Sequence, residues 1–341
     1  MRQYTVIFAF VFTHFNSFSQ QLVTVQHNGN SAFYSTFFDA YSNCQSGDTI
    51  YLPGGVYAAG FSISKEVHIV GVGHDPDFTS ATDITTLNSG IFFYNGSNYS
   101  SITGVAVSII AINTSGDMGP SNYIDIYRCK LTSVEITTPA SNNTIRECII
   151  DNISGYYDTP SNYPTNNTFF NNIINGQVRN FGLNNFIHNN IFIGIGCCTS
   201  FVAPLYNITQ SLIQNNIFCT VNTINFGTPQ CTFKNNMTSG DIYCAEGICN
   251  GNIVSVPLNT IFVSYDGSGS FNYNYDFQLQ SMNAGNNAGT DGTDMGIYGG
   301  DFPWKEGSVP FNPHIKLKTI STKTNSSGNL NVNITVEAQE E

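Results

Sequence analysis

Apolar positions in the middle of the chain follow a short recurring phrase, in which two apolar runs flank a pair of asparagines. Successive copies start 18 to 26 residues apart. Each run is too short for a helix and has the β-branched and aromatic content of a strand. A unit of this size buries its apolar residues only by stacking on its neighbours, so the pattern predicts a solenoid. The copies span 142–150, 166–174, 184–192 and 210–218, with a weaker copy at 230–237 and a degenerate one at 123–131.

The asparagine pair indicates which kind of solenoid this is. Asn tolerates the left-handed backbone of a sharp turn between strands, and stacked Asn side chains can hydrogen-bond from coil to coil. Leucine is too scarce for a leucine-rich repeat, and the regular Ile and Phe positions argue against an Asn-rich disordered chain. We therefore expect an all-β fold, a right-handed parallel β-helix solenoid. One of its corners should be formed by Asn171, Asn189, Asn215 and Asn235.

Aligning the copies also predicts two stacked rows of apolar side chains. The first row should fill the core and consists of Ile145, Phe169, Ile187, Ile213 and Phe233. The second row follows the turn and consists of Ile149, Ile173, Ile191, Ile217 and Met237.

The first coils carry a recognisable sequence. Aromatic spacing in 32–43 predicts a short amphipathic helix. It is followed by Gly-Asp-Thr-Ile at 47–50, Leu-Pro-Gly-Gly-Val-Tyr at 52–57 and Ile-Val-Gly-Val-Gly at 69–73. This stretch resembles the start of the pectate-lyase-like right-handed β-helix superfamily, in which a capping helix precedes such strands. With the Asn repeats, the resemblance covers roughly 22–300. It implies the fold but no single activity, because the superfamily includes lyases, hydrolases, esterases and non-enzymatic surface proteins.

The sequence predicts that the chain consists of three segments. Arg2, the apolar run 4–13 and the polar stretch 16–21 predict a signal peptide over 1–20, which is too short to span a bilayer. We therefore expect a secreted or cell-surface protein, with no transmembrane span and monomeric. The β-helix should occupy 21–300. Residues 301–341 should form a linker and a small β extension, since 315–322 and 330–336 alternate around a Gly-containing turn.

The net charge of the chain limits the classes of partner that it can bind. The formal net charge is −12 and only 11 residues are Lys or Arg, so no basic patch is available for nucleic acid. An anionic polysaccharide is disfavoured for the same reason unless a cation bridges it. A neutral glycan or a protein surface stays open as a partner.

The resemblance raises the question of catalysis. Lyases of the superfamily use Arg or Lys beside carboxylates that hold calcium, and its hydrolases use clustered Asp. The candidates here are Arg128, Glu147, Asp151 and Arg179, with Arg128 aligned to Glu147 in the next copy. A surface charge network explains the same residues, and the repeats contain no Asp-Asp doublet. We expect a non-catalytic protein that binds carbohydrate or a surface. The alternative is a polysaccharide lyase or glycoside hydrolase.

Binding residues are expected on projecting loops at 113–122 and 155–164. Tyr123, Tyr156, Tyr157 and Tyr163 could stack on sugar rings there. Asp291 and Asp294 could offer oxygen ligands to calcium, or they could cap backbone amides in a turn. No other cofactor is expected.

Nine cysteines in an exported chain permit disulfides. The candidate pairs are Cys244–Cys249, Cys219–Cys231 and a vicinal Cys197–Cys198. Cys129 and Cys148 occupy equivalent places in adjacent copies, where buried, stacked thiols are the simpler expectation.

Overall fold

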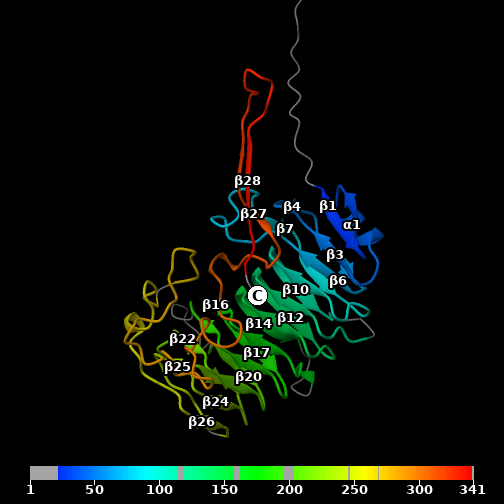
Figure 1. Cartoon of the computed structure of the whole chain (residues 1–341). Helices are drawn as coiled ribbons and strands as arrows, with labels where there is room; N and C mark the ends of the chain where they lie inside the picture. The colour runs from blue at the N-terminus through cyan, green and yellow to red at the C-terminus, as the bar shows by residue number, and fades with distance from the viewer. Residues whose placement is uncertain are drawn as a thin grey trace, which may run out of the picture.

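The computed structural model describes residues 22–113, 119–156, 162–194, 203–244, 246–267 and 269–339. It shows a parallel β-solenoid of about nine turns, with a long hairpin projecting from one end (Figure 1). This confirms the predicted all-β solenoid. The predicted signal peptide lies outside the described residues.

Two sheets run the length of the solenoid. The first contains, in spatial order, β2 (Asn30–Tyr34), β1 (Val23–His27), β3 (Asp48–Tyr51), β6 (Val67–Val70), β9 (Ser101–Thr103), β11 (Asp125–Tyr127), β13 (Thr144–Arg146), β15 (Thr168–Phe170), β18 (Phe186–His188), β21 (Leu212–Gln214), β24 (Thr232–Lys234) and β26 (Ile248–Asn250). All its pairings are parallel except those of β1 with β2 and β3.

The second sheet is branched and parallel. Its main path is β25 (Met237–Thr238), β22 (Ile217–Phe218), β19 (Ile191–Phe192), β16 (Ile173–Ile174), β14 (Ile149–Tyr156), β12 (Lys130–Thr137), β10 (Ala106–Ile112), β7 (Thr85–Leu87) and β4 (Gly55–Tyr57). The branches are β17 (Val178–Phe181), β20 (Leu205–Ile208) and β23 (Asn225–Phe226) on one side, and β5 (Ser62–Ile63) and β8 (Ile91–Phe93) on the other. Two 3-10 turns, η2 (Leu258–Thr260) and η3 (Glu306–Ser308), lie after the last coil.

The strands of the first sheet are short because left-handed residues bound them on both sides. In the coils of β11, β13, β15, β18, β21 and β24, the residue two positions before the strand and the residue directly after it have φ between 44° and 59°. Asn suits this conformation better than most residues. The row after the strands is Arg128, Glu147, Asn171, Asn189, Asn215 and Asn235, so the four predicted asparagines do share one corner.

The core lies between the sheets and matches the first predicted row. Ile145, Phe169, Ile187, Ile213 and Phe233 are the middle residues of successive strands, and each is completely buried. Phe192 and Phe218 stack with ring centroids 4.5 Å apart on the opposite side of this core.

Buried asparagines link the coils at two corners. Asn172, Asn190, Asn216 and Asn236 each donate their backbone N–H and side-chain Nδ2 to the Oδ1 of the next Asn, at 2.9–3.0 Å, and the ladder ends on Asn252. A second ladder joins Asn143, Asn167 and Asn185 and ends on Ser211. These bonds satisfy polar groups that would otherwise be buried unpaired.

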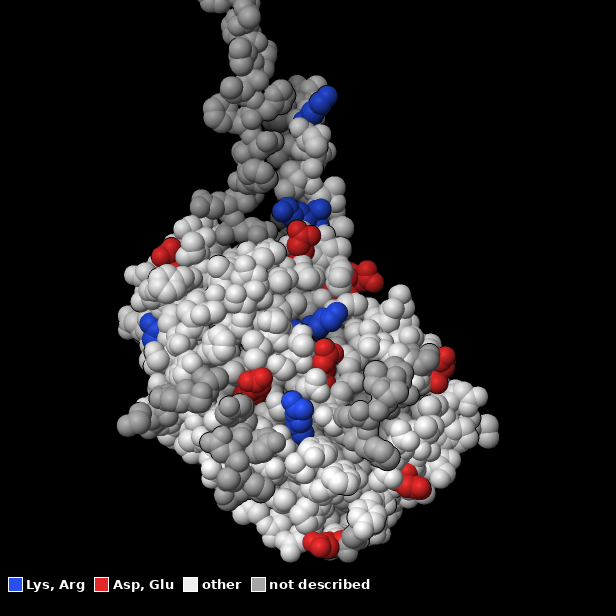
Figure 2. All heavy atoms as spheres, turned by 180° about the vertical axis from the view of Figure 1, so that it is seen from behind, with Lys and Arg blue, Asp and Glu red and all other residues white. Residues whose placement is uncertain are grey.

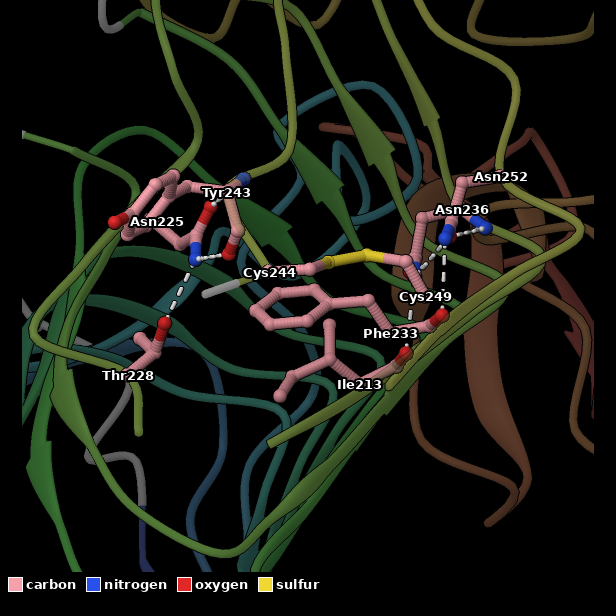
Figure 3. The surroundings of a disulfide bond; sticks show 9 residues. All are labelled: Ile213, Asn225, Thr228, Phe233, Asn236, Tyr243, Cys244, Cys249 and Asn252. Carbon is pink, nitrogen blue, oxygen red and sulfur yellow. Dashed lines mark hydrogen bonds between the residues drawn. A yellow bond between two sulfur atoms is a disulfide. The ribbon is translucent and has the colours of Figure 1, made fainter. Parts of the chain in front are cut away.

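The two ends of the solenoid are closed differently. At the first end, the β1–β2 hairpin and helix α1 (Phe37–Asn43) cover the core, with Phe37 and Ala40 buried and Thr36 as N-cap. At the last end, the Cys244–Cys249 disulfide lies beside Phe233 and Ile213 (Figure 3). This confirms one of the predicted pairs. Cys219 and Cys231 are buried and unpaired, so that predicted pairing is wrong. Cys197–Cys198 lies outside the described residues.

Residues 253–311, which we call the return segment, run back along the outside of the solenoid. The coil strands end at Asn250, and the rest of the stretch to 300 belongs to this segment. It covers the second predicted row, which faces away from the solenoid interior. There Ile149, Ile173, Ile191, Ile217 and Met237 form a second buried core with Ile261, Phe262, Tyr265, Phe277, Met295 and Ile297.

The outer corner asparagines hold the return segment in place. Asn235 Nδ2 donates to Ala288 O (2.8 Å), Asn189 Nδ2 to Gly296 O (3.3 Å) and Asn171 Nδ2 to Gly299 O (2.9 Å). From Ala288 onward the segment therefore runs opposite to the order of the coils. Beyond it, β27 (His314–Ile320) and β28 (Val332–Glu337) form the antiparallel hairpin that projects in Figure 1.

Candidate functional site

The charged candidates meet at the corner after β11 and β13. Arg128 follows β11 and Glu147 follows β13, so consecutive coils place them side by side, and Arg128 Nε donates to Glu147 Oε2. Arg146 Nη2 donates to Asp125 Oδ2 at 3.0 Å, and its Nη1 lies 4.0 Å from Glu147 Oε1. Two guanidinium groups and two carboxylates thus form one charge-balanced cluster.

The return segment covers this cluster. Arg128 is completely buried, its Nη1 donates to Val309 O (2.6 Å), and the Phe311 ring lies 3.9 Å from its guanidinium carbon. Ser308 Oγ donates to Glu147 O at 2.9 Å. Arg128 and Glu147 therefore bind the chain's own return segment rather than facing an open cleft.

Burial and charge shift the pKa values around the cluster. Burial acts to lower the pKa of Arg146, but the Asp125 carboxylate outweighs it and the pKa lies above its ordinary value. The Arg146 guanidinium carbon lies 4.3 Å from the centre of the Tyr127 ring. Burial, followed by Asp125, raises the pKa of Tyr127 to about 12. These shifts keep Arg146 charged and Tyr127 neutral near neutral pH.

The other two charged candidates lie elsewhere. Asp151 Oδ1 accepts a hydrogen bond from Asn175 Nδ2 at 2.8 Å. Arg179 is exposed on β17, between Ser154 and Tyr206 of the neighbouring strands. No described contact joins either residue to Arg128 or Glu147. The four candidates therefore do not form one site.

An aromatic pair marks the opposite corner of the first sheet. Tyr99 and Tyr123 stack with ring centroids 4.8 Å apart and planes 4° from parallel. They are 60% and 48% exposed, and both have left-handed backbones, with φ of 66° and 59°. Tyr123 was expected from the sequence. Tyr99 was missed because its coil precedes the recognisable repeats.

Amide side chains flank the aromatic pair. Asn122 accepts from Ser141 N through its Oδ1 (2.8 Å), and Asn98 Oδ1 accepts from Asn122 N (2.7 Å). Asn98 and Asn122 are half-buried, and each directly precedes one of the two tyrosines in the chain. The corner thus combines exposed rings with neutral hydrogen-bonding groups.

The other predicted tyrosines contribute less to this surface. Tyr163 is only 6% exposed, so the structure leaves it no free ring face for stacking. Tyr156 ends β14, but its side chain and all of Tyr157 lie outside the described residues.

Asp291 and Asp294 sit in a turn of the return segment. Asp291 Oδ1 accepts from Thr293 N (3.0 Å) and Thr293 Oγ1 (2.7 Å), and Asp294 Oδ1 accepts from Asn287 N (2.8 Å). Burial acts to raise the pKa of Asp291, but the Thr293 hydrogen bonds outweigh it and lower the pKa. Within the part of the chain that the structure describes, no cluster of three or more metal-ligating side chains occurs. The two carboxylates act as turn caps here.

A groove of about 520 Å³ lies where the return segment meets the first coils. Its lining includes Tyr51, Pro53, Asp83, Pro310 and Lys318. Sequence reasoning could not find this groove, because its walls are more than two hundred residues apart in the chain.

No family model matches the chain, and no curated protein matches it either. Among the described residues, no helix is long and apolar enough to cross a membrane.

Proposed function

We propose that this chain is an exported, non-catalytic β-helix protein that binds carbohydrate or a neighbouring surface through Tyr99 and Tyr123. The resemblance of 47–73 to the pectate-lyase-like superfamily supports this class, because many such folds bind polysaccharides. The predicted signal peptide supports export, and the chain's shortage of basic residues favours a neutral glycan.

The observation that carries the proposal is the backbone conformation of the two tyrosines. The same corner holds Asn142, Asn166, Asn184, Gln210 and Gln230 in later coils, and the three Asn among them adopt the left-handed region at little cost. A bulky residue pays about 1 kcal/mol more there. Both rings are nevertheless largely exposed, so burial recovers little of that cost. Strain held at an exposed position favours a functional role.

The geometry suits sugar binding. An aromatic ring face stacks on the apolar face of a pyranose without requiring charge. The neighbouring Asn98, Asn122 and Ser141 supply neutral donors and acceptors for hydroxyl groups. A neutral glycan thus finds both kinds of contact along two consecutive coils.

The catalytic alternative requires Arg128 or Arg146 to reach a substrate. Arg128 is completely buried and Arg146 is 9% exposed, and both contact the return segment. A lyase or hydrolase reaction at this cluster would need that segment to move away. The exposed aromatic pair needs no such movement, and this difference favours binding.

The test offers soluble neutral and acidic polysaccharides to the purified chain, with and without calcium, and follows binding, unsaturated products and new reducing ends. We expect binding of a neutral glycan without turnover, weakened about tenfold in Tyr99→Ala and Tyr123→Ala. Tyr243→Ala, which removes another exposed ring (64%), is the matched control and should bind normally. Calcium-dependent release of unsaturated sugars, abolished by Arg128→Ala or Arg179→Ala, would overturn the proposal.

A further inference from the structure

The projecting hairpin gathers apolar side chains on one face, whose base borders the groove against the first coils. Residue pairing across β27 and β28 places Ile320 opposite Val332, Lys318 opposite Ile334 and Ile315 opposite Val336, and these side chains share a face. Val332, Ile334 and Val336 are 50–58% exposed. The other face carries Thr319, Asn333 and Thr335, together with Leu317, which is 48% exposed. A two-stranded hairpin is only marginally stable alone in water, so an apolar face of this kind favours a partner.

The opposite end of the solenoid has a free strand edge. Among the described strands, β26 pairs only with β24 and is the last strand of the first sheet. Its residues are all exposed, with Ile248 at 64% and the nearby Tyr243 also at 64%. Such an edge can accept another strand through its unpaired backbone groups. The disulfide joins Cys249 of β26 to Cys244 and lies beside the core residues Phe233 and Ile213 (Figure 3).

Charge distinguishes the two ends. In the last coil, residues 235–252 contain two carboxylates, Asp241 and Glu246, and no Lys or Arg, while the exposed Lys234 lies beside this coil on β24. The hairpin holds Lys316, Lys318 and Lys323 against one carboxylate, Glu337. Lys316 pairs with Glu337. Among the described residues, Lys318 and Lys323 have no ion-pair partner. Figure 2 shows blue side chains on the hairpin and red ones around the far end.

We propose that the chain assembles head to tail, with the β27–β28 hairpin of one copy docking on the β26 end of the next copy. The apolar hairpin face would cover Tyr243 and Ile248, and Lys318 and Lys323 would face Asp241 and Glu246. A hairpin-to-hairpin dimer is disfavoured, because it would bring the unpaired lysines of two copies together. Two different surfaces meet in this contact, so it repeats in a row rather than closing at two copies. It replaces the monomer expected from the sequence and is independent of the proposed glycan binding.

Sedimentation velocity of the purified chain at rising concentration, in low and high salt, tests this directly. We expect species larger than a dimer that grow with concentration and dissociate as salt screens the charges. Lys318→Glu with Lys323→Glu should weaken association at least tenfold, and so should Asp241→Lys with Glu246→Lys. Mixing these two variants should restore assembly, because each reversed surface then meets its complement.

Two further variants separate the apolar contribution from charge. Val332→Thr with Ile334→Thr alters the apolar face and should weaken assembly, whereas Thr335→Ser on the polar face should not. All these positions are exposed, so circular dichroism should show an intact solenoid. A single-chain mass at every concentration would overturn the proposal. A dimer that ignores the Asp241 and Glu246 reversal would overturn it too.

Discussion

Adjacent asparagines of one pair perform opposite tasks in this solenoid. In the pair Asn189–Asn190, the first residue has a φ of 53° and directs its side chain outward to Gly296 of the return segment. The second is completely buried and bonds to Asn172, Asn216 and two backbone carbonyls. The same contrast recurs at 171–172, 215–216 and 235–236. One residue type thus joins coil to coil on the inside and coil to return segment on the outside.

The difference teaches that the corner has two separate energetic roles. The inner row consists of Asn172, Asn190, Asn216 and Asn236. Their side chains hydrogen-bond to buried backbone groups and link each coil to the two neighbouring coils. The outer row consists of Asn171, Asn189, Asn215 and Asn235. These residues adopt the left-handed backbone of the turn, and their side chains bind the return segment, which is not part of the coils. Substitutions on the two rows should therefore differ in size, although the residues are neighbours in sequence.

Asn190→Ala should have the largest effect. It leaves the Phe169 and His188 carbonyls and the Asn172 amide without their partners in a buried site. We expect a loss of about 3 kcal/mol in the free energy of unfolding. Urea denaturation measures it. A loss below about 1 kcal/mol would show that the inner ladder does not hold the coils together.

Acid should weaken the attachment of the return segment next. His74 is buried, and its Nδ1 lies 3.1 Å from the hydroxyl of Tyr273 in that segment. Burial, with help from the Lys130 charge, lowers the pKa of His74 from 6.5 to about 3. Between these values the unfolded chain binds more protons, so stability falls as the pH drops from 6.5 towards 3. We expect a loss on the order of 3 kcal/mol from this group by pH 4.

The control for this acid effect is His74→Asn, which keeps a donor near Tyr273 but does not titrate. Denaturation midpoints measured from pH 7 to pH 4 should depend less on pH in this variant. An unchanged pH dependence would assign the acid sensitivity to other groups.

Asn189→Ala tests the outer row and should cost about 1 kcal/mol, mostly because Ala disfavours a left-handed backbone. Asn189→Gly removes the same hydrogen bond to Gly296 but accepts the backbone conformation. It should therefore be nearly neutral in the same denaturation experiment. A loss from Asn189→Gly as large as that from Asn190→Ala would erase the distinction between the rows.

Cys148→Asn should have the smallest effect, and a favourable one. Cys148 occupies the inner row one coil before Asn172, and its Sγ lies 3.4 Å from the backbone nitrogen of Cys129. An Asn here would extend the ladder by one rung, with a gain of about 0.5 kcal/mol. Cys148→Ser, which supplies a hydroxyl but no side-chain amide to donate along the ladder, is the control. Destabilisation of the Asn variant beyond that of the Ser variant would contradict this.

The repeats predicted the coils and their corner because the Asn pair and the flanking Ile and Phe rows depend on local sequence. They did not show which Asn faces inward, since both carry the same side chain. They also did not show that the Ile149 row lies under a second layer. That layer comes from the return segment, whose Gly-rich sequence has no repeat of its own.

Only part of the candidate site could likewise be predicted from the sequence. Alignment of the copies placed Arg128 beside Glu147, as found. The burial of Arg128, however, depends on the segment around Val309, 181 residues later in the chain. Tyr123 could be found from its position in the repeat. Recognising Tyr99 required knowing that the coil of Tyr99 stacks directly on the coil of Tyr123. Asp291 and Asp294 looked like calcium ligands because turn caps and metal ligands use the same side chains.

The most direct test of the functional account replaces both strained tyrosines by Asn, the residue found at this corner in three of the later coils. Tyr99→Asn with Tyr123→Asn relieves the left-handed strain while removing the rings. Denaturation and glycan binding are measured on the same preparation, beside Tyr243→Asn. We predict unchanged or higher stability with affinity for the neutral glycan reduced at least tenfold. Unchanged affinity, or an equal loss in Tyr243→Asn, would contradict a binding site at this corner.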